Sequence, residues 1–287
     1  MAATTQLALP SRTVSPIAIW HLLSLDAPTI AALWTWFIAR ADHIRIPLAE
    51  PAALAFAVWI LYAADRLLDA ANDEHSDQLE ARHHFHHRHA RAFLIGITLA
   101  AAVIAALLPH LDPAAIRLYL IEGALLIAWL LIVHTTRSSD RLPKEIVVGL
   151  FFSTAVFIPT VVREPVVREP SLRSALLPSA MLFAALCSLN CLFIYAWEHR
   201  SHARPPHTTA RLALAHLPAI AVAAAIAGTA LTLLNPTRPN PIPAACALAA
   251  AALLLLNHNR HRLTRTHLRA AADLALLAPI LLLPFVR

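Results

Sequence analysis

Aspartates recur every four residues after the second apolar stretch, where Asp65, Asp69, Asp73 and Asp77 fall within DRLLDAANDEHSD. On an α-helix such residues share one face, with about 6 Å between successive Cβ atoms. The resulting acidic stripe repels itself unless cations neutralise it, and its oxygen ligands suit Mg²⁺ bound together with a substrate phosphate. We therefore predict a functional role for Asp65 and Asp69, which lie at the end of a membrane helix where ionisable residues are usually functional, and interpret Asp77 as part of a solvated helix end.

Five histidines follow within residues 83–89, directly after Arg82. On a helix His83 and His87 would share a face, and imidazole nitrogens can bind Zn²⁺ or another transition metal. The spacing matches no standard zinc pattern, so a Zn²⁺ site at His83 and His87 is the less favoured interpretation. Arg82 could instead bind phosphate. We interpret residues 65–91 as a polar cytoplasmic loop that carries the aspartate stripe and this His/Arg block.

Polar residues also lie at the edges of two later apolar stretches. Asn190 falls inside the stretch 172–197, and Glu198 follows eight residues later on a nearby helical face. An amide inside an apolar helix needs a partner, which is either a neighbouring helix or a metal or substrate. Lys144 and Arg141 precede the stretch 145–162, where a lysine either extends to the membrane interface or contributes charge to a site.

Nine apolar stretches must position these groups. They cover residues 17–39, 47–64, 91–111, 114–135, 145–162, 172–197, 210–234, 240–257 and 270–286. About 20 helical residues cross the hydrocarbon core, and helices satisfy all their backbone hydrogen bonds within lipid. We predict an all-α, polytopic membrane protein with nine transmembrane helices, forming a single integral membrane domain over residues 1–287.

Composition agrees with this class of protein. Hydrophobic residues make up 59% of the chain and charged residues only 14%, against about 25% charged residues in soluble domains. Fifteen of the 23 Lys and Arg residues fall in loops on one side of the predicted topology, which should be the cytoplasmic side. We expect the inner (cell) membrane of a bacterium, a cytoplasmic N-terminus and a C-terminus on the opposite side.

The basic charge does not indicate a nucleic-acid partner. The net charge is +6, but no Lys/Arg run is interleaved with aromatic residues. Such a distribution suits loops at an anionic membrane face. We therefore expect membrane lipid as a partner and no nucleic acid.

A short tandem repeat lies on the side that is poorer in basic residues. Residues 161–165 read VVREP, and residues 166–170 repeat the same five letters. We interpret the pair as duplicated loop sequence. No longer period indicates a repeat architecture.

These features, in this order, resemble the UbiA-type intramembrane prenyltransferase superfamily. Leu25-Asp26-Ala27-Pro28 resembles its opening Asp-x-Pro element, and residues 65–69 match the second half of its first motif, N-D-x-x-D-R-x-x-D. The run from Leu142 to Pro159 is similar to its fifth helix. Asn190 and Glu198 fall where its second motif, N-D-x-x-D-x-x-x-D, begins and ends.

The chain departs from that pattern at both motifs. Leu61 and Tyr62 stand where the first motif has its Asn-Asp pair, and Cys191 and Ile194 replace two acids of the second. The resemblance is therefore to an atypical member.

The resemblance implies Mg²⁺-dependent transfer of a polyprenyl group from a diphosphate donor to an acceptor. The implied catalytic residues are Asp65, Asp69 and Lys144; the implied diphosphate-binding residues are Arg66, Arg82, Arg141 and Asn190; and the implied metal ligands are Asp65, Asp69, Asp73, Asn190 and Glu198. Two alternatives remain open: a non-catalytic relative that binds an isoprenoid or lipid or scaffolds a complex, and a His-rich membrane protein that handles a transition metal.

Overall fold

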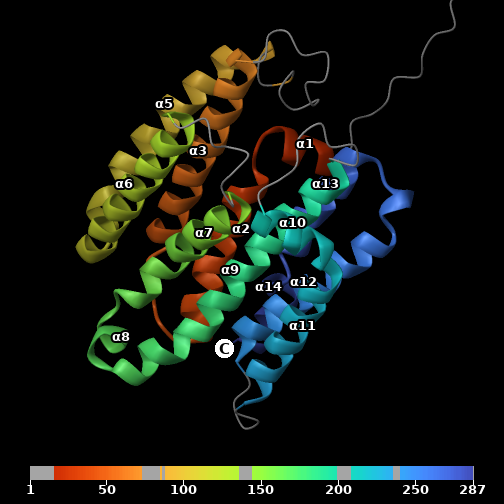
Figure 1. Cartoon of the computed structure of the whole chain (residues 1–287). Coiled ribbons are helices and arrows are strands. Elements are labelled where there is room, and N and C mark those ends of the chain that lie inside the picture. The colour runs from red at the N-terminus through yellow and green to blue at the C-terminus, as the bar shows by residue number, and fades with distance from the viewer. Residues whose placement is uncertain are drawn as a thin grey trace, which may run out of the picture.

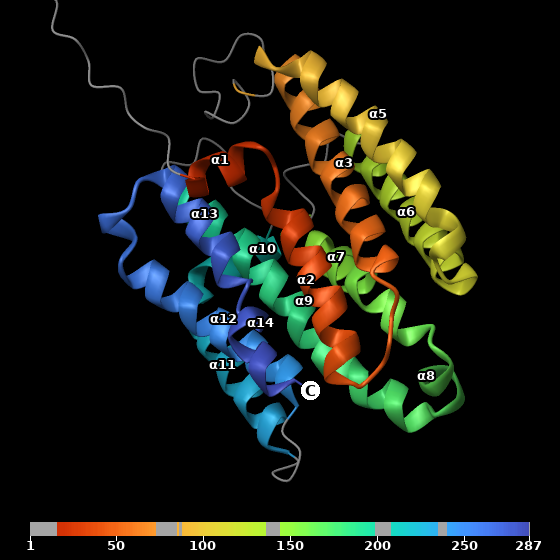
Figure 2. The same ribbon diagram turned by 180° about the vertical axis from the view of Figure 1, so that it is seen from behind.

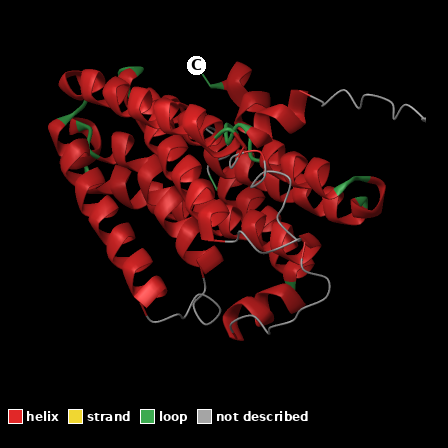
Figure 3. Cartoon of the chain, turned by 90° about the horizontal axis from the view of Figure 1, so that it is seen from above, coloured by secondary structure: helices red, strands yellow, loops and turns green. Residues whose placement is uncertain are grey.

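All regular elements of the described chain are helices (Figures 1 and 3). The computed structural model describes residues 16–72, 85, 88–135, 144–198, 208–234 and 240–286. The longer helices are α2 (Asp26–Ala41), α3 (Ala49–Asn72), α5 (Ala90–Leu107), α6 (Pro113–Thr135), α7 (Lys144–Val161), α9 (Pro170–Glu198), α11 (Leu217–Leu233), α12 (Pro241–His258) and α13 (Arg265–Ala275). The shorter ones are α1 (Pro16–Leu22), η1 (Leu108–His110), α8 (Glu164–Arg168), α10 (Thr208–Ala215), η2 (Arg260–Arg262), α14 (Pro279–Leu282) and η3 (Leu283–Phe285). The all-α prediction is confirmed for these residues.

Six helical segments of the described chain are long and apolar enough to cross a membrane. They are Ala49–Leu68, Ala90–His110, Lys144–Val161, Pro170–Glu198, Pro241–His258 and His267–Phe285. These six correspond to six of the nine predicted stretches, and Leu217–Leu233 is a shorter apolar helix. The helices thus support an integral membrane protein, and the count of nine stays a prediction.

Three of the stretches, each predicted as one continuous helix, are divided into two helices in the structure. The stretch 17–39 divides into α1 and α2 at Ser24, whose φ of 58° is left-handed. The stretch 210–234 divides at His216, just before Pro218, and 270–286 divides before Pro279. Proline lacks the N–H that a continuing helix needs but fits a first helical turn, so new helices start there.

Helix α9 lies at the centre of the bundle and packs against α7, α11, α12 and α13 (Figure 2). Helix α2 contacts α3, α7 and α13, so it joins the two sides of the bundle. The centre is aromatic: Trp34 of α2 is fully buried, with its ring 4.2 Å from that of Phe183 of α9. Trp34 Nε1 also donates to the carbonyl of Leu276 at 2.7 Å, which fixes α2 against the end of α13.

Helices α5 and α6 form the outer part of the bundle. Helix α5 packs on α3, and α6 packs on α7. Large apolar side chains point outward from both, among them Leu94, Ile95, Leu99, Leu120, Ile121, Leu125 and Ile127. Soluble monomers rarely expose extended apolar surface of this kind, so these faces suit contact with lipid.

Candidate functional site

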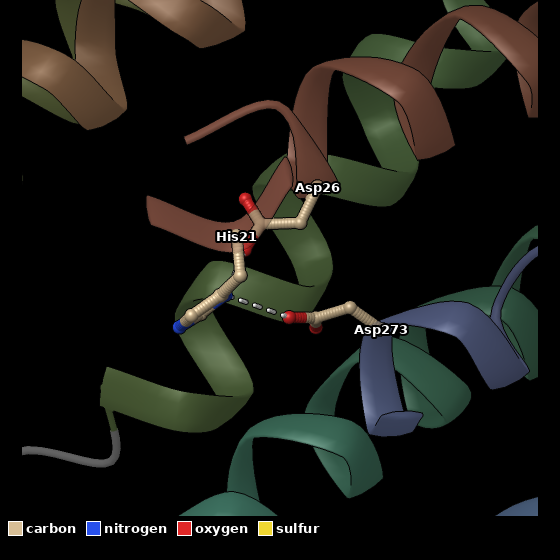
Figure 4. A group of neighbouring side chains, drawn as sticks. All are labelled: His21, Asp26 and Asp273. Atoms are coloured by element: carbon tan, nitrogen blue, oxygen red, sulfur yellow. Dashed lines mark hydrogen bonds and ion pairs between the residues drawn. The ribbon is translucent and has the colours of Figure 1, made fainter. Parts of the chain in front are cut away.

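A buried group of ionisable side chains joins α1, α2 and α13. His21, Asp26 and Asp273 are only 3%, 3% and 9% exposed. His21 Nδ1 lies 2.6 Å from Asp26 Oδ2 and 3.8 Å from Asp273 Oδ2, and Figure 4 shows the three side chains converging. Among the described residues, these three form the group that could hold a metal ion, with one ligand atom from each lying within 4.8 Å of the others.

The break between α1 and α2 creates this arrangement. On a continuous helix His21 and Asp26 would point about 140° apart, because successive residues turn by about 100°. The left-handed Ser24 reverses the chain between them, so the imidazole at the end of α1 faces the carboxylate at the start of α2. Asp26 Oδ1 also accepts from the backbone N–H of Ala27 at 2.9 Å, which orients the carboxylate.

Arg66 of α3 braces the same turn. Its Nη1 donates to the carbonyl of His21 at 3.3 Å and to the hydroxyl of Ser24, and its Nη2 lies 4.0 Å from Asp26 Oδ2. The guanidinium also lies 5.9 Å from the ring of Tyr62. Arg66 is buried, so it acts first as a partner of Asp26 and of the α1–α2 turn.

Asn190 of α9 completes the group. Its Nδ2 donates to Asp273 Oδ1 at 3.0 Å, so the hydrogen bond between helices that the sequence allowed is present. Its Oδ1 is buried and has no hydrogen-bond partner among the residues that the structure describes. We refer to His21, Asp26, Arg66, Asn190 and Asp273 as the polar cluster.

The charges of the polar cluster are unbalanced. Arg66 lies 4.0 Å from Asp26, and Arg269, one helical turn before Asp273, pairs with Glu198 at 2.7 Å, so three carboxylates share two guanidinium groups.

The structure brings together only some of the predicted site residues. Arg66 and Asn190 lie in the polar cluster, whereas the side chains of Asp65 and Lys144 are exposed, and Glu198 is held by Arg269. Asp69 belongs to α3, but its side chain lies outside the described part. Asp73, Asp77, Arg82, His83, His87 and Arg141 lie wholly outside the described residues. The roles predicted for all of these residues stay predictions.

Sequence reasoning gave no role to His21, Asp26, Arg269 or Asp273, although Asp26 belonged to the Asp-x-Pro element. A signal was present for both acids. Asp26 and Asp273 lie inside predicted apolar stretches, and ionisable residues there are expensive and usually functional. That rule would have selected the two carboxylates of the cluster.

An apolar groove of about 710 Å³ lies between α2, α3 and α5. Its walls include Leu33, Phe56, Trp59 and Val103. Trp59 Nε1 donates to the carbonyl of Leu23 at 3.0 Å, next to the α1–α2 turn. Gly96 permits this position, since a Cβ there would meet the Trp59 ring at 2.7 Å.

Comparison with known proteins adds no relative. No family model, no curated protein and no solved structure matches this chain. The function is therefore argued from the geometry of the polar cluster and the groove.

Proposed function

We propose that this chain is an atypical UbiA-type membrane transferase that moves a polyprenyl group from a diphosphate donor to an acceptor with a divalent cation. One observation carries the proposal. Asp26, Arg66 and Asn190 come from three of the four elements on which the resemblance rests, and they meet in one buried cluster. The nine-helix bundle, the bacterial inner membrane and the cytoplasmic side for this end belong to the same proposal.

The missing motif acids have replacements in this arrangement. Tyr62 and Cys191 stand at motif positions where the superfamily has acids. Asp26 and Asp273 instead bring carboxylates from α2 and α13 to the two sides of His21. The cluster thus keeps the acidic character of the motifs with a different set of helices.

In such a transfer the protein must stabilise a leaving diphosphate. The allylic C–O bond breaks with both electrons leaving on the diphosphate, the acceptor attacks the resulting carbocation, and the acceptor then gives up a proton to solvent. A bound divalent cation would neutralise charge on the departing oxygens. Asp26 and Asp273 would hold that cation, Arg66 would limit their mutual repulsion, and exposed Asp65 and Lys144 would meet the diphosphate from the water side.

The packing of α7 on α9 supports this role for Lys144. Gly149 of α7 packs against Ser188 of α9, so the first turn of α7 lies beside the last turns of α9. The end of α9 also carries Glu198, which pairs with Arg269 of α13. Basic and acidic groups therefore gather at the end of the bundle that holds the polar cluster.

The first prediction concerns catalysis. Purified protein in nanodiscs, given labelled polyprenyl diphosphates of several chain lengths with Mg²⁺ or Mn²⁺, should release diphosphate and form a labelled product. Asp26→Asn and Asp273→Asn should each lower the rate about 100-fold, because charge stabilisation at the leaving oxygens is lost.

Glu169→Gln is the matched control, since it neutralises an exposed carboxylate at the opposite end of the bundle. Asp65→Asn tests whether the aspartate stripe contributes as well. The proposal fails if no donor is bound or cleaved, or if Asp26→Asn and Asp273→Asn retain the wild-type rate.

The groove favours a second candidate, a non-catalytic protein that binds an isoprenoid or another lipid chain. Its lining is almost wholly apolar, and it ends at Leu25, the residue before Asp26. Along α3, Trp59, Tyr62 and Arg66 fall on one helical face, which leads from the groove toward the buried guanidinium. An amphiphile with an apolar chain and an anionic head would suit this gradient.

The second prediction concerns binding of an isoprenoid or lipid chain in the groove. Ala32→Phe fills the groove, so photo-crosslinking by an isoprenoid analogue should fall at least tenfold, whereas Ala223→Phe, on an exposed face of α11, should leave it unchanged. Crosslinking without diphosphate release in the wild type would favour the second candidate over the transferase. Equal crosslinking in both variants would remove the groove from either function.

A further inference from the structure

We propose that His21, Asp26, Asp273 and Asn190 form a mixed nitrogen–oxygen site for one divalent ion of a first-row transition metal, in preference to Mg²⁺. The inference deepens the proposed function by naming the ligands and the class of the cation. Metal binding can be measured without any transferase activity, so the two proposals can fail separately.

The spacing of the donor atoms suits one small ion. Bonds of about 2.0–2.2 Å to nitrogen and oxygen ligands place ligand atoms roughly 3–3.5 Å from one another. His21 Nδ1 lies 2.6 Å from Asp26 Oδ2 and 3.8 Å from Asp273 Oδ2. Shifts of less than about 1 Å in these side chains would therefore open coordination positions around a common centre.

Asn190 provides a second, independent observation. Its side chain is 7% exposed, and its Oδ1 lacks a hydrogen-bond partner among the described residues. Buried polar atoms normally have partners, so an orphaned acceptor needs an explanation. The bond from Nδ2 to Asp273 Oδ1 holds this amide against the carboxylate of Asp273. An amide oxygen next to a carboxylate is a ligand type that divalent cations use.

The negative charge of the two carboxylates also favours a bound cation. Two buried carboxylates disfavour each other's charge, and Arg66 approaches only Asp26, at 4.0 Å. Arg269 is already paired with Glu198. Either a shared proton or a bound dication must relieve the remaining repulsion, and these two states can be distinguished by measurement.

The ligand types decide between metals. Imidazole suits Zn²⁺, Fe²⁺ and related ions, whereas Mg²⁺ prefers oxygen ligands and keeps several waters. The side chains of His21 and Asp26 are almost fully buried, which leaves little space for such waters. The site therefore differs in kind from the Mg²⁺ site predicted on the aspartate stripe.

The test uses the full chain in nanodiscs, stripped with chelator and titrated with Mn²⁺, Zn²⁺ and Mg²⁺. Electron paramagnetic resonance should show one tightly bound Mn²⁺ per chain. Zn²⁺ should displace this ion, whereas a hundredfold excess of Mg²⁺ should not. His21→Gln and Asp273→Asn should each weaken Mn²⁺ binding at least tenfold. The nitrogen hyperfine coupling of the bound Mn²⁺ should disappear in His21→Gln.

Two controls address the many other histidines. His110→Ala removes an exposed imidazole at the far end of α5, and the double variant His83→Ala, His87→Ala removes the pair in the His/Arg block; each should leave the tight site intact. If His21→Gln does not fold, a metal-dependent rise in the melting temperature, present in the wild type and absent in Asp273→Asn, serves the same purpose.

The inference is overturned if Mg²⁺ binds as tightly as Mn²⁺, if both site variants bind like the wild type, or if the tight site disappears with His83 and His87. Tight Mn²⁺ binding without prenyl transfer would instead refute only the transferase. Prenyl transfer in the wild type, together with unchanged Mn²⁺ binding in His21→Gln and Asp273→Asn, would refute only the metal site.

Discussion

Replacing Arg163 by alanine is expected to destabilise the protein by about 3–5 kcal/mol, the cost of leaving a buried charge without its partner. Glu50, in the first turn of α3, is 1% exposed, and Arg163 Nη2 donates to its Oε1. Arg163 Nη1 also lies 3.6 Å from Asp112 Oδ2, and the backbone N–H of Asp112 donates to Glu50 Oε1 at 3.4 Å. This network connects three inter-helix turns at the end of the bundle opposite the polar cluster.

The tandem repeat provides a matched control for this prediction. Arg168 occupies the same position in the second VVREP copy, but its side chain is exposed. Arg168→Ala should therefore change stability by no more than about 0.5 kcal/mol. Thermal unfolding in detergent would separate the two, with a fall of about 10 °C expected for Arg163→Ala.

The double variant Glu50→Gln, Arg163→Met should recover part of the loss, because no buried charge then remains unpaired. Equal melting temperatures for Arg163→Ala and Arg168→Ala would contradict this account. The same five letters would then have the same role in both copies.

Gly149→Ala is expected to cost about 3 kcal/mol, at the upper end of the range for overpacking. Helices α7 and α9 pack closely at this position. An added Cβ would meet Ser188 Oγ, and it would lie 2.6 Å from the carbonyl oxygen of Ala184 and 2.9 Å from the backbone nitrogen of Ser188. Backbone atoms cannot move aside like a flexible side chain, so the two helices would have to separate.

Gly123→Ala is the control, since nothing lies within 4 Å of a Cβ at that position of α6. A helical alanine there should be neutral or stabilise by up to about 1 kcal/mol. Size-exclusion chromatography after heating would measure both variants. Ser188→Ala should not rescue Gly149→Ala, because the clash with the Ala184 carbonyl remains; full rescue would show that the backbone contact is unimportant.

At the interface between α7 and α9, small residues allow close packing and hydrogen bonds between helices, which hold helices together in lipid. Ser153 Oγ donates to the carbonyl of Ala180 at 2.8 Å across the same pair of helices. Close approach at Gly149 shortens the distance over which such bonds must reach. The position of Lys144 beside the end of α9 depends on this packing, so the proposed site depends on it too.

The sequence by itself determined the class of the protein and much of its helical content. In the hydrocarbon core of a bilayer, backbone N–H and C=O groups have no water to bond to. Apolar runs long enough to cross it therefore form helices, in which these groups bond to one another. The same rule explains why six predicted stretches correspond to candidate spans. Asp26 and Asp273 were also visible as acids inside such stretches, although no role was given to them.

Only the tertiary structure decided which polar groups meet. Asn190 and Asp273 are 83 residues apart yet share a hydrogen bond, and no local period predicts such a contact. The left-handed Ser24 turns His21 toward Asp26 where hydropathy predicts one continuous helix. Likewise, identical VVREP copies place Arg163 beside a buried carboxylate and Arg168 at the surface. Hydropathy is a property of each segment alone. The hydrogen-bond and ion-pair partners of a side chain depend instead on how the helices cross, and the crossing is set by side chains that are distant in the sequence.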